Sequence, residues 1–294
     1  MRCSMINSLL KYRGFALNAI KEQYAYKFKA MIWVMYDMIL LFVQYFLWKA
    51  IFDANGGSLY DISIKQYVNY IVVGMVTARF LVCFIDGVIA DEIKSGNIAM
   101  NFIKPYSYIL MNIAKQVGVV VGGIIALTPL LIVSFLLVGF IDVSLLTVFY
   151  YIISVILAFF IIIFFNLILG ICAFWITNYW GLRLLKWHFF VIFSGEMIAI
   201  TMFFKIAENG IKNFPISVSE PIIQGFFKIL GIMSYCLPFQ AMGYTPTAIF
   251  TGLITGTHSI LLHLGLQVIW VVVMLVSLIL IWNVAKKQVT VLGG

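Results

Sequence analysis

Long runs of apolar residues constrain the fold of this sequence more than any other feature. A helix of about 20 apolar residues spans the hydrocarbon core of a bilayer, and each run is long enough to form one. Only 10% of the 294 residues are charged, against about 25% in soluble domains. We therefore predict an all-α integral membrane protein, one domain over residues 1–294, with six transmembrane helices. Their expected ranges are about 31–52, 67–90, 109–140, 145–177, 182–204 and 260–284.

Lysine and arginine are distributed unevenly between the two sides of such a protein. Six spans place on one side Arg2, Lys11, Arg13, Lys21, Lys27, Lys29, Lys94, Lys104, Arg183, Lys186, Lys286 and Lys287. The other side has only Lys65, Lys205, Lys212 and Lys228. Cytoplasmic segments are enriched in these residues, so both termini are predicted to be cytoplasmic. The basic residues flank apolar runs, which indicates that the net charge of +8 faces membrane lipid and not nucleic acid.

Residues 1–30 form a basic segment whose apolar residues recur at helical spacing. These apolar positions are Met5, Leu9, Tyr12, Phe15, Ala16 and Ile20. The pattern is typical of an amphipathic helix that lies in the membrane interface, with its cations near anionic lipid. The alternative is a solvated tail. We favour the interfacial helix, on the cytoplasmic side.

Residues 207–257 precede the last span and are apolar, but they are interrupted. Gly225, Gly231 and Pro238 break the run, and Pro215 and Pro221 come before it. A seventh span here would place the C-terminus outside and remove the charge asymmetry. We therefore predict short re-entrant helices that enter the outer leaflet and return. Irregular backbone at that depth must be shielded by protein, so these helices should pack against the spans.

Sequence signatures of catalysis are absent from the chain. It has no G-x-x-x-x-G-K-[ST] phosphate loop, no H-E-x-x-H motif and no nucleophile elbow. The three histidines and four cysteines lack metal-ligand spacing. We expect no catalytic, metal or cofactor-binding site and no nucleotide-binding domain in this chain, which is therefore not an enzyme. Energy for uphill transport would come from a partner or an ion gradient.

A polar interruption, DEIKSGNIAMNFIKPYS, separates the second and third predicted spans at Asp91–Ser107. Asp91 and Glu92 are expected to open a helix, where carboxylates are favourable. Ser95–Asn97 are expected to bend the chain, and Pro105 to end the element. Apolar residues lie between these positions, which favours a short amphipathic element at the membrane surface that contacts a soluble protein. An ordinary cytosolic loop is the alternative.

Several motifs in order resemble those of type-2 ATP-binding-cassette (ABC) exporter permeases. They are DEIKSGNIAMNFIKPYSY after the second span, FWITNYWGLRLL and FSGEMI around the fourth and fifth, and CLPFQAMGYTPTAIFTG before the last. Each motif alone is weakly specific, but their order and spacing together are moderately specific. The resemblance covers about residues 10–285. Residues 205–220 depart from it, because they are longer and more polar than the family pattern.

The resemblance implies a cytoplasmic coupling helix at residues 91–105 that docks into a separate ABC ATPase subunit. The docking candidates are Asp91, Glu92, Lys94, Ser95, Gly96 and Asn97. It also implies two ATPase copies, which would bind ATP and Mg, and a second permease chain, identical or homologous. The protein would then be an exporter subunit in the bacterial cytoplasmic membrane. Its cargo would be amphipathic or hydrophobic: a peptide antibiotic, a drug or a lipid-linked compound.

Ionisable residues inside predicted spans are costly and suggest function. Asp37, Arg79, Asp86 and Glu196 occupy such positions. Arg79 and Asp86 are seven residues apart, which predicts a shared helix face, and an Asp37–Arg79 ion pair is plausible. Such a pair either fixes the packing of the spans or contributes to cargo contact or gating. Further candidates are Glu196 for the exit path, and Tyr36 and Gln44, with Trp33 and Tyr45, for a cavity between two chains.

Two rival functions remain open at this point. An ion-gradient-driven secondary transporter would show inverted repeats and helices broken at mid-membrane, and no internal repeat is evident. A membrane-embedded lipid enzyme would need catalytic histidine or carboxylate groups clustered at one interface, and none is evident.

Overall fold

The computed structural model describes residues 2–25, 27–124, 128–139, 141–176, 178–210 and 220–292, almost all of them in helices. The helices are α1 (Arg2–Ala25), α2 (Lys27–Ala54), α3 (Ile64–Phe80), α4 (Ile85–Lys94), α5 (Ile98–Phe102), α6 (Tyr108–Gly123), α7 (Thr128–Val138), α8 (Leu145–Ile171), α9 (Tyr179–Phe193), α10 (Ile200–Asn209), α11 (Glu220–Cys236), α12 (Phe239–Met242), α13 (Tyr244–Phe250) and α14 (Thr257–Leu292). Strands β1 (Ser58–Leu59) and β2 (Ile62–Ser63) form a small antiparallel hairpin, and a 3₁₀ turn follows α8 at Cys172–Phe174. The predicted all-α membrane fold is confirmed at this level.

Four helical stretches in the described part of the chain are long and apolar enough to cross a membrane. They are Met31–Ala54, Ile64–Lys94, Leu145–Phe174 and Thr257–Gln288. A fifth is counted if α6 and α7, which meet at a bend of 48°, form one broken span. The chain is therefore a multi-pass membrane protein. Residues 182–204 were predicted as one continuous span, but they form α9 and α10 with a break between them.

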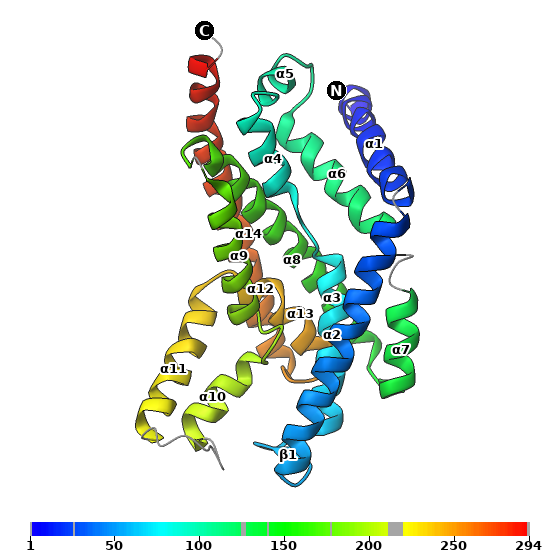
Figure 1. Cartoon of the computed structure of the whole chain (residues 1–294), viewed down its shortest axis with the longest axis vertical. Coiled ribbons are helices and arrows are strands. Elements are labelled where there is room, and N and C mark those ends of the chain that lie inside the picture. The colour runs from blue at the N-terminus through cyan, green and yellow to red at the C-terminus, as the bar shows by residue number, and fades with distance from the viewer. Residues whose placement is uncertain are drawn as a thin grey trace.

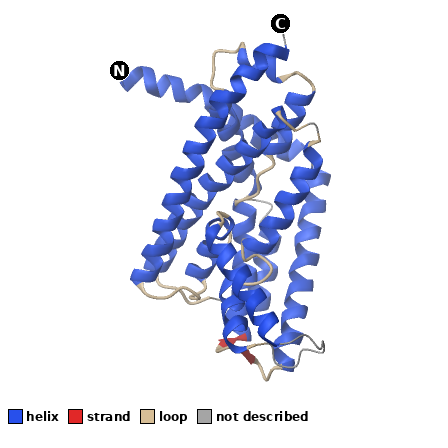
Figure 2. Ribbon diagram, turned by 90° about the vertical axis from the view of Figure 1, so that its left-hand side faces the viewer, coloured by secondary structure: helices blue, strands red, loops and turns tan. Residues whose placement is uncertain are grey.

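Both ends of the chain lie at the same end of the molecule. Figure 1 shows the N-terminus, the C-terminus and α5 at the top, and β1 with the far ends of α10 and α11 at the bottom. Figure 2 shows the two strands at the end opposite the termini. The prediction that the termini and residues 91–105 share one side agrees with this arrangement.

Helix α1 packs along the length of α6. The Tyr12 hydroxyl accepts a hydrogen bond from the Ser107 amide at 2.9 Å, and a methyl group on Gly118 would overlap the Ala16 backbone. In Figure 2 the helix that starts at the N-terminus projects sideways across the long axis of the bundle. This orientation fits a helix in the membrane plane, and that location stays a prediction. The side chains of Met5 and Leu9 lie outside the described residues.

Within residues 207–257, α11 is a long helix, while α12 and α13 are short and buried. Helices α10 and α11 lie side by side, while α12 and α13 pack against α8. Six of their apolar side chains are buried: Phe239, Ala241, Met242, Tyr244, Ala248 and Ile249. This burial matches the shielding that was expected for irregular backbone. Lys212 and Pro215 lie outside the described residues.

A buried glutamine ties the last span to this region. Gln267 of α14 accepts a hydrogen bond from Ser154 of α8 at 2.9 Å and donates to the Ala241 carbonyl of α12 at 2.7 Å. Buried polar groups need such partners, because an unpaired one costs free energy. The contacts hold the start of α14 against α8 and α12.

Candidate functional site

A break between α9 and α10, at Ser194–Ala199, turns the backbone into the protein interior. Gly195 adopts a left-handed φ of +77°, which glycine allows without steric cost. Two tyrosines of α3 bind the exposed backbone groups: the Tyr70 hydroxyl donates to the Gly195 carbonyl at 2.5 Å, and the Tyr67 hydroxyl accepts from the Ala199 amide at 3.2 Å. Non-helical backbone at membrane depth requires such support. The break places Glu196 on the wall of a cavity.

A second break separates α3 from α4 at Leu81–Phe84. The Val82 carbonyl in this segment accepts a hydrogen bond from the Gln116 side chain of α6. Leu81 and Cys83 are buried, so the segment is part of the protein core and not a surface loop. The break ends α3 at Phe80, and its residues Leu81–Phe84 form part of the cavity lining.

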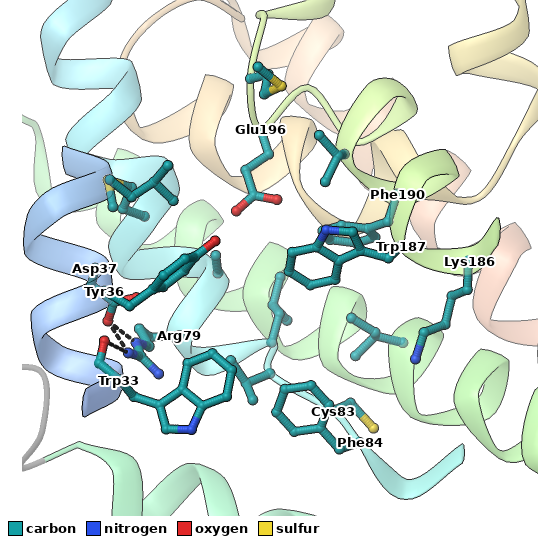
Figure 3. A pocket seen from close by; sticks show the side chains of 18 of the residues that line it. Trp33, Tyr36, Asp37, Arg79, Cys83, Phe84, Lys186, Trp187, Phe190 and Glu196 are labelled. Atoms are coloured by element: carbon teal, nitrogen blue, oxygen red, sulfur yellow. Dashed lines mark hydrogen bonds and ion pairs between the residues drawn. The ribbon is translucent and has the colours of Figure 1, made fainter. Parts of the chain in front are cut away.

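These two breaks and helices α2, α3, α8 and α9 line a partly open cavity of about 340 Å³. Figure 3 shows the side chains that line it, which come from elements far apart in the sequence. Five of the six predicted cavity or ion-pair residues are among them: Tyr36, Asp37, Gln44, Arg79 and Glu196. Sequence reasoning missed further lining residues, among them Phe84, Asn166, Lys186, Trp187 and Phe190.

Asp37 of α2 and Arg79 of α3 form an ion pair at the cavity edge. The guanidinium donates to the Asp37 carboxylate through two nitrogens and to the Trp33 carbonyl at 3.0 Å. The two side chains retain 16% and 20% of their exposure. The pair therefore joins two spans and also borders the cavity.

Glu196 differs from the other cavity carboxylate because it lacks a counter-charge. Among the residues that the structure describes, its carboxylate has no hydrogen-bond or ion-pair partner. Its backbone amide donates to the Ser194 hydroxyl at 3.2 Å, which fixes the start of the turn. In Figure 3 the carboxylate points into the space between Tyr36 and Trp187.

Asp86 lies outside the cavity, in the first turn of α4, with 1% of its surface exposed. It accepts hydrogen bonds from Lys186 at 2.6 Å and from the Tyr179 hydroxyl, both on α9. Lys186 also donates to Asn166 of α8 at 2.9 Å. We refer to Asp86, Lys186, Tyr179 and Asn166 as the Asp86 network. The prediction that Arg79 and Asp86 share a helix face is wrong, because the chain is not helical at Leu81–Phe84.

The Asp86 network joins α4 to the cavity wall. Lys186 lines the cavity, and Trp187 follows it on α9. Next to Asp86, Gly87 leaves room for the guanidinium of Arg183, which a methyl group there would overlap. On α8, Gly170 lets α4 approach so closely that an added Cβ would lie 2.9 Å from the Ile89 Cβ. Helix α4 therefore cannot shift without moving α8, α9 or their side chains.

The predicted docking stretch forms the end of α4, a tight turn and α5. Asp91, Lys94 and Ser95–Asn97 are exposed at the end of the molecule that holds the termini. Gly96 adopts a φ of +74° with open space around it. Met100 and Ile103 beside them are 61% and 78% exposed, which adds an apolar ridge.

Two details of this stretch differ from expectation. Asp91 and Glu92 lie in the last turn of α4 and do not open a helix. Glu92 turns inward and accepts hydrogen bonds from the Tyr108 hydroxyl at 2.5 Å and from Asn101 at 3.1 Å. It therefore braces the turn against α6 and is less available for docking than its neighbours. Phe102 stacks on Trp282 of α14, with ring centroids 5.4 Å apart, which fixes α5 to the last span.

No group of three or more histidine, cysteine, aspartate or glutamate side chains that could hold a metal exists within the described ranges. A multi-pass helical bundle with a partly open cavity between its helices defines the class as a polytopic membrane protein. A family model described as ABC-2 family transporter protein matches residues 38–293. The chain therefore belongs to this family and is an ABC transporter permease, the membrane subunit that works with an ABC ATPase. Neither the search of curated proteins nor that of solved structures found a match.

Proposed function

We propose that this chain is the transmembrane subunit of a bacterial exporter that moves an amphipathic or hydrophobic cargo with ATP hydrolysed by a separate subunit. The observation that carries the proposal is the continuous contact from the exposed turn at Gly96, through α4 and the Asp86 network, to the cavity wall at Trp187. Two permease chains, identical or homologous, and two ATPase copies holding ATP and Mg complete the complex in the cytoplasmic membrane.

The membrane topology in this proposal has six crossings and two cytoplasmic termini. They are α2, α3 with α4, α6 with α7, α8, α9 with α10, and α14. Helix α11 then re-enters from the outer face, and α12 and α13 lie at depth beneath it. The shared end of the termini and α5, together with the lysine and arginine asymmetry, supports this assignment.

The mechanism follows from the packing of α4. ATP-driven closure of the ATPase dimer would push on Asp91, Lys94 and the Gly96 turn. Because Asp86 is bonded to α9 and Gly170 holds α4 against α8, the push would move the wall that contains Lys186 and Trp187. Such a movement changes the shape of the cavity. The chain itself supplies the path, and the partner supplies the energy.

Charge reversal at the exposed turn tests the docking assignment. Asp91→Arg should abolish co-purification with the ABC ATPase, or its coupled ATPase activity, while the chain still inserts in the membrane. Asp53→Arg is the matched control, since Asp53 is exposed near the end of α2, at the opposite end of the molecule. Full coupling in Asp91→Arg would contradict the assignment, as would equal loss in both variants.

Bulk at the turn gives a second test of the same surface. Gly96→Trp should block docking by filling the open space around the turn. Gly96→Asn is the control, because asparagine tolerates a left-handed backbone better than other residues. Loss in both variants would indicate a strained turn, whereas loss in the tryptophan variant alone indicates a blocked surface.

A further inference from the structure

The cavity lining holds one carboxyl group, that of Glu196, that meets no cation within the described residues. Arg79 is neutralised by Asp37, and Lys186, which lines the cavity, is paired with Asp86 outside it. Glu196 is left over, since within the described part of the chain no cation contacts its carboxylate. A carboxylate inside a membrane protein is costly unless it meets a counter-charge or water. A cation brought from outside this chain would pair with this carboxylate and offset that cost.

Aromatic rings surround the position where that counter-charge would lie. Trp33, Tyr36, Phe84, Trp187 and Phe190 all line the cavity. In Figure 3 Tyr36 and Trp187 flank the Glu196 carboxylate on opposite sides. The face of an aromatic ring attracts cations within about 6 Å, most strongly when water is excluded. A carboxylate combined with ring faces is suited to an organic ammonium or a similar diffuse cation.

The remainder of the wall is apolar, including Leu40, Met75, Ile162 and Val191. A small hydrated metal ion would lose its water here without gaining oxygen ligands, because a single free carboxylate is present among the described lining residues. A lipophilic cation loses little hydration and gains apolar contact. An anion of the same shape would face the Glu196 charge in a medium of low dielectric constant, where repulsion is strong.

We propose that this cavity binds amphipathic organic cations, with Glu196 as the counter-ion and Tyr36 and Trp187 as the flanking aromatic contacts. The proposal rests on the proposed function only in treating the cavity as the cargo path. Binding itself needs no ATPase. The proposal narrows the cargo class to molecules that combine a positive charge with an apolar body.

Two ions of nearly equal shape and opposite charge provide a direct test. Tetraphenylphosphonium and tetraphenylborate are measured by quenching of tryptophan fluorescence, using the purified full chain in nanodiscs of zwitterionic phosphatidylcholine. Empty nanodiscs give the background of partition into lipid. We expect saturable binding of the phosphonium and at least a tenfold weaker affinity for the borate. Equal affinity for the two ions, or tighter binding of the borate, would overturn the proposal without any variant.

Variants then assign the charge preference to one residue. Glu196→Gln should lower phosphonium affinity about tenfold and leave borate binding unchanged or stronger, whereas Glu196→Asp should retain the preference. The matched control is Glu208→Gln, which removes a carboxylate from the exposed surface of α10 and should change nothing. Unchanged phosphonium affinity in Glu196→Gln would overturn the assignment. If that variant does not fold, Trp187→Leu replaces it and should weaken phosphonium binding more than borate binding.

The failures of the two proposals are separable. If Asp91→Arg and Asp53→Arg both retain coupling while the phosphonium preference holds, the docking assignment is wrong and the binding site stands. If docking behaves as expected while both ions bind equally, the cation site alone is wrong.

Discussion

Two ion pairs among the described residues, Asp86–Lys186 and Asp37–Arg79, occupy different surroundings. Asp86 is 1% exposed, and the Lys186 ammonium is shared between it and Asn166, so this cluster belongs to the packed interior. Asp37 and Arg79 retain 16% and 20% exposure and border the cavity. Asp86 does not line the cavity, which indicates a structural and coupling role for the Asp86–Lys186 pair, although Lys186 and Asn166 are also part of the cavity wall. The Asp37–Arg79 pair is partly exposed to the cavity, so it can contact cargo as well as hold two spans together.

The largest expected effect is the loss of stability in Asp86→Ala. The Lys186 ammonium would stay buried without its carboxylate, and breaking a buried pair from one side costs about 3–5 kcal/mol. Thermal unfolding of the detergent-purified chain measures this loss, with Asp53→Ala as the exposed control.

A double variant sharpens the same test. Asp86→Leu combined with Lys186→Met removes both charges, and it should recover most of the stability, because apolar replacement of a buried pair is often neutral. The recovered chain should still be impaired in coupling, since the bond from α4 to α9 is gone. If Asp86→Ala unfolds at the same temperature as the wild-type chain, the Asp86–Lys186 pair does not stabilise the fold, and the proposed difference between the two ion pairs is wrong.

A smaller loss is expected from Asp37→Asn. Removing this charge should cost about 1–2 kcal/mol, between the values for exposed and buried pairs. Arg79 would then neutralise the field of Glu196, so phosphonium affinity should fall as well. The same nanodisc titration and unfolding measurements apply. A stability loss as large as that of Asp86→Ala, with normal binding, would show that the Asp37–Arg79 pair is purely structural.

The smallest effect on stability is expected from Gly87→Ala. The added methyl group overlaps only the end of the flexible Arg183 side chain, which can move. Stability should change by less than about 1 kcal/mol, whereas coupling between ATP hydrolysis and cavity movement should weaken, because the guanidinium leaves the α4–α9 contact. Gly123→Ala, where nothing lies within 4 Å, is the control. If Gly87→Ala couples as well as the wild-type chain, Arg183 has no part in coupling, and the α4–α9 contact acts through the Asp86 network alone.

The uninterrupted spans were predictable because composition alone defines them. Residues 145–171 and 260–284 are continuous apolar runs that became α8 and most of α14. The contact between Asp37 and Arg79 was also accessible, because the two opposite charges lie inside consecutive predicted spans, 31–52 and 67–90.

The helix breaks were not predictable from periodicity. Residues 81–84 contain neither glycine nor proline, and their backbone is held by Gln116 from a distant helix. The prediction that Arg79 and Asp86 share a helix face was wrong for this reason. Lys186 was counted as a cation near a loop, although the polar Asn166 within an apolar run was a signal that a buried partner existed.

Transport in proteoliposomes tests the central claim most directly, namely that the energy for this path enters through α4 from a partner. The chain is reconstituted with and without the ABC ATPase, membrane potential is clamped at zero, and uphill accumulation of tetraphenylphosphonium is followed. The account predicts accumulation only when the ATPase and MgATP are both present, and its loss in Asp91→Arg. Accumulation by the chain alone under a proton or sodium gradient would contradict it.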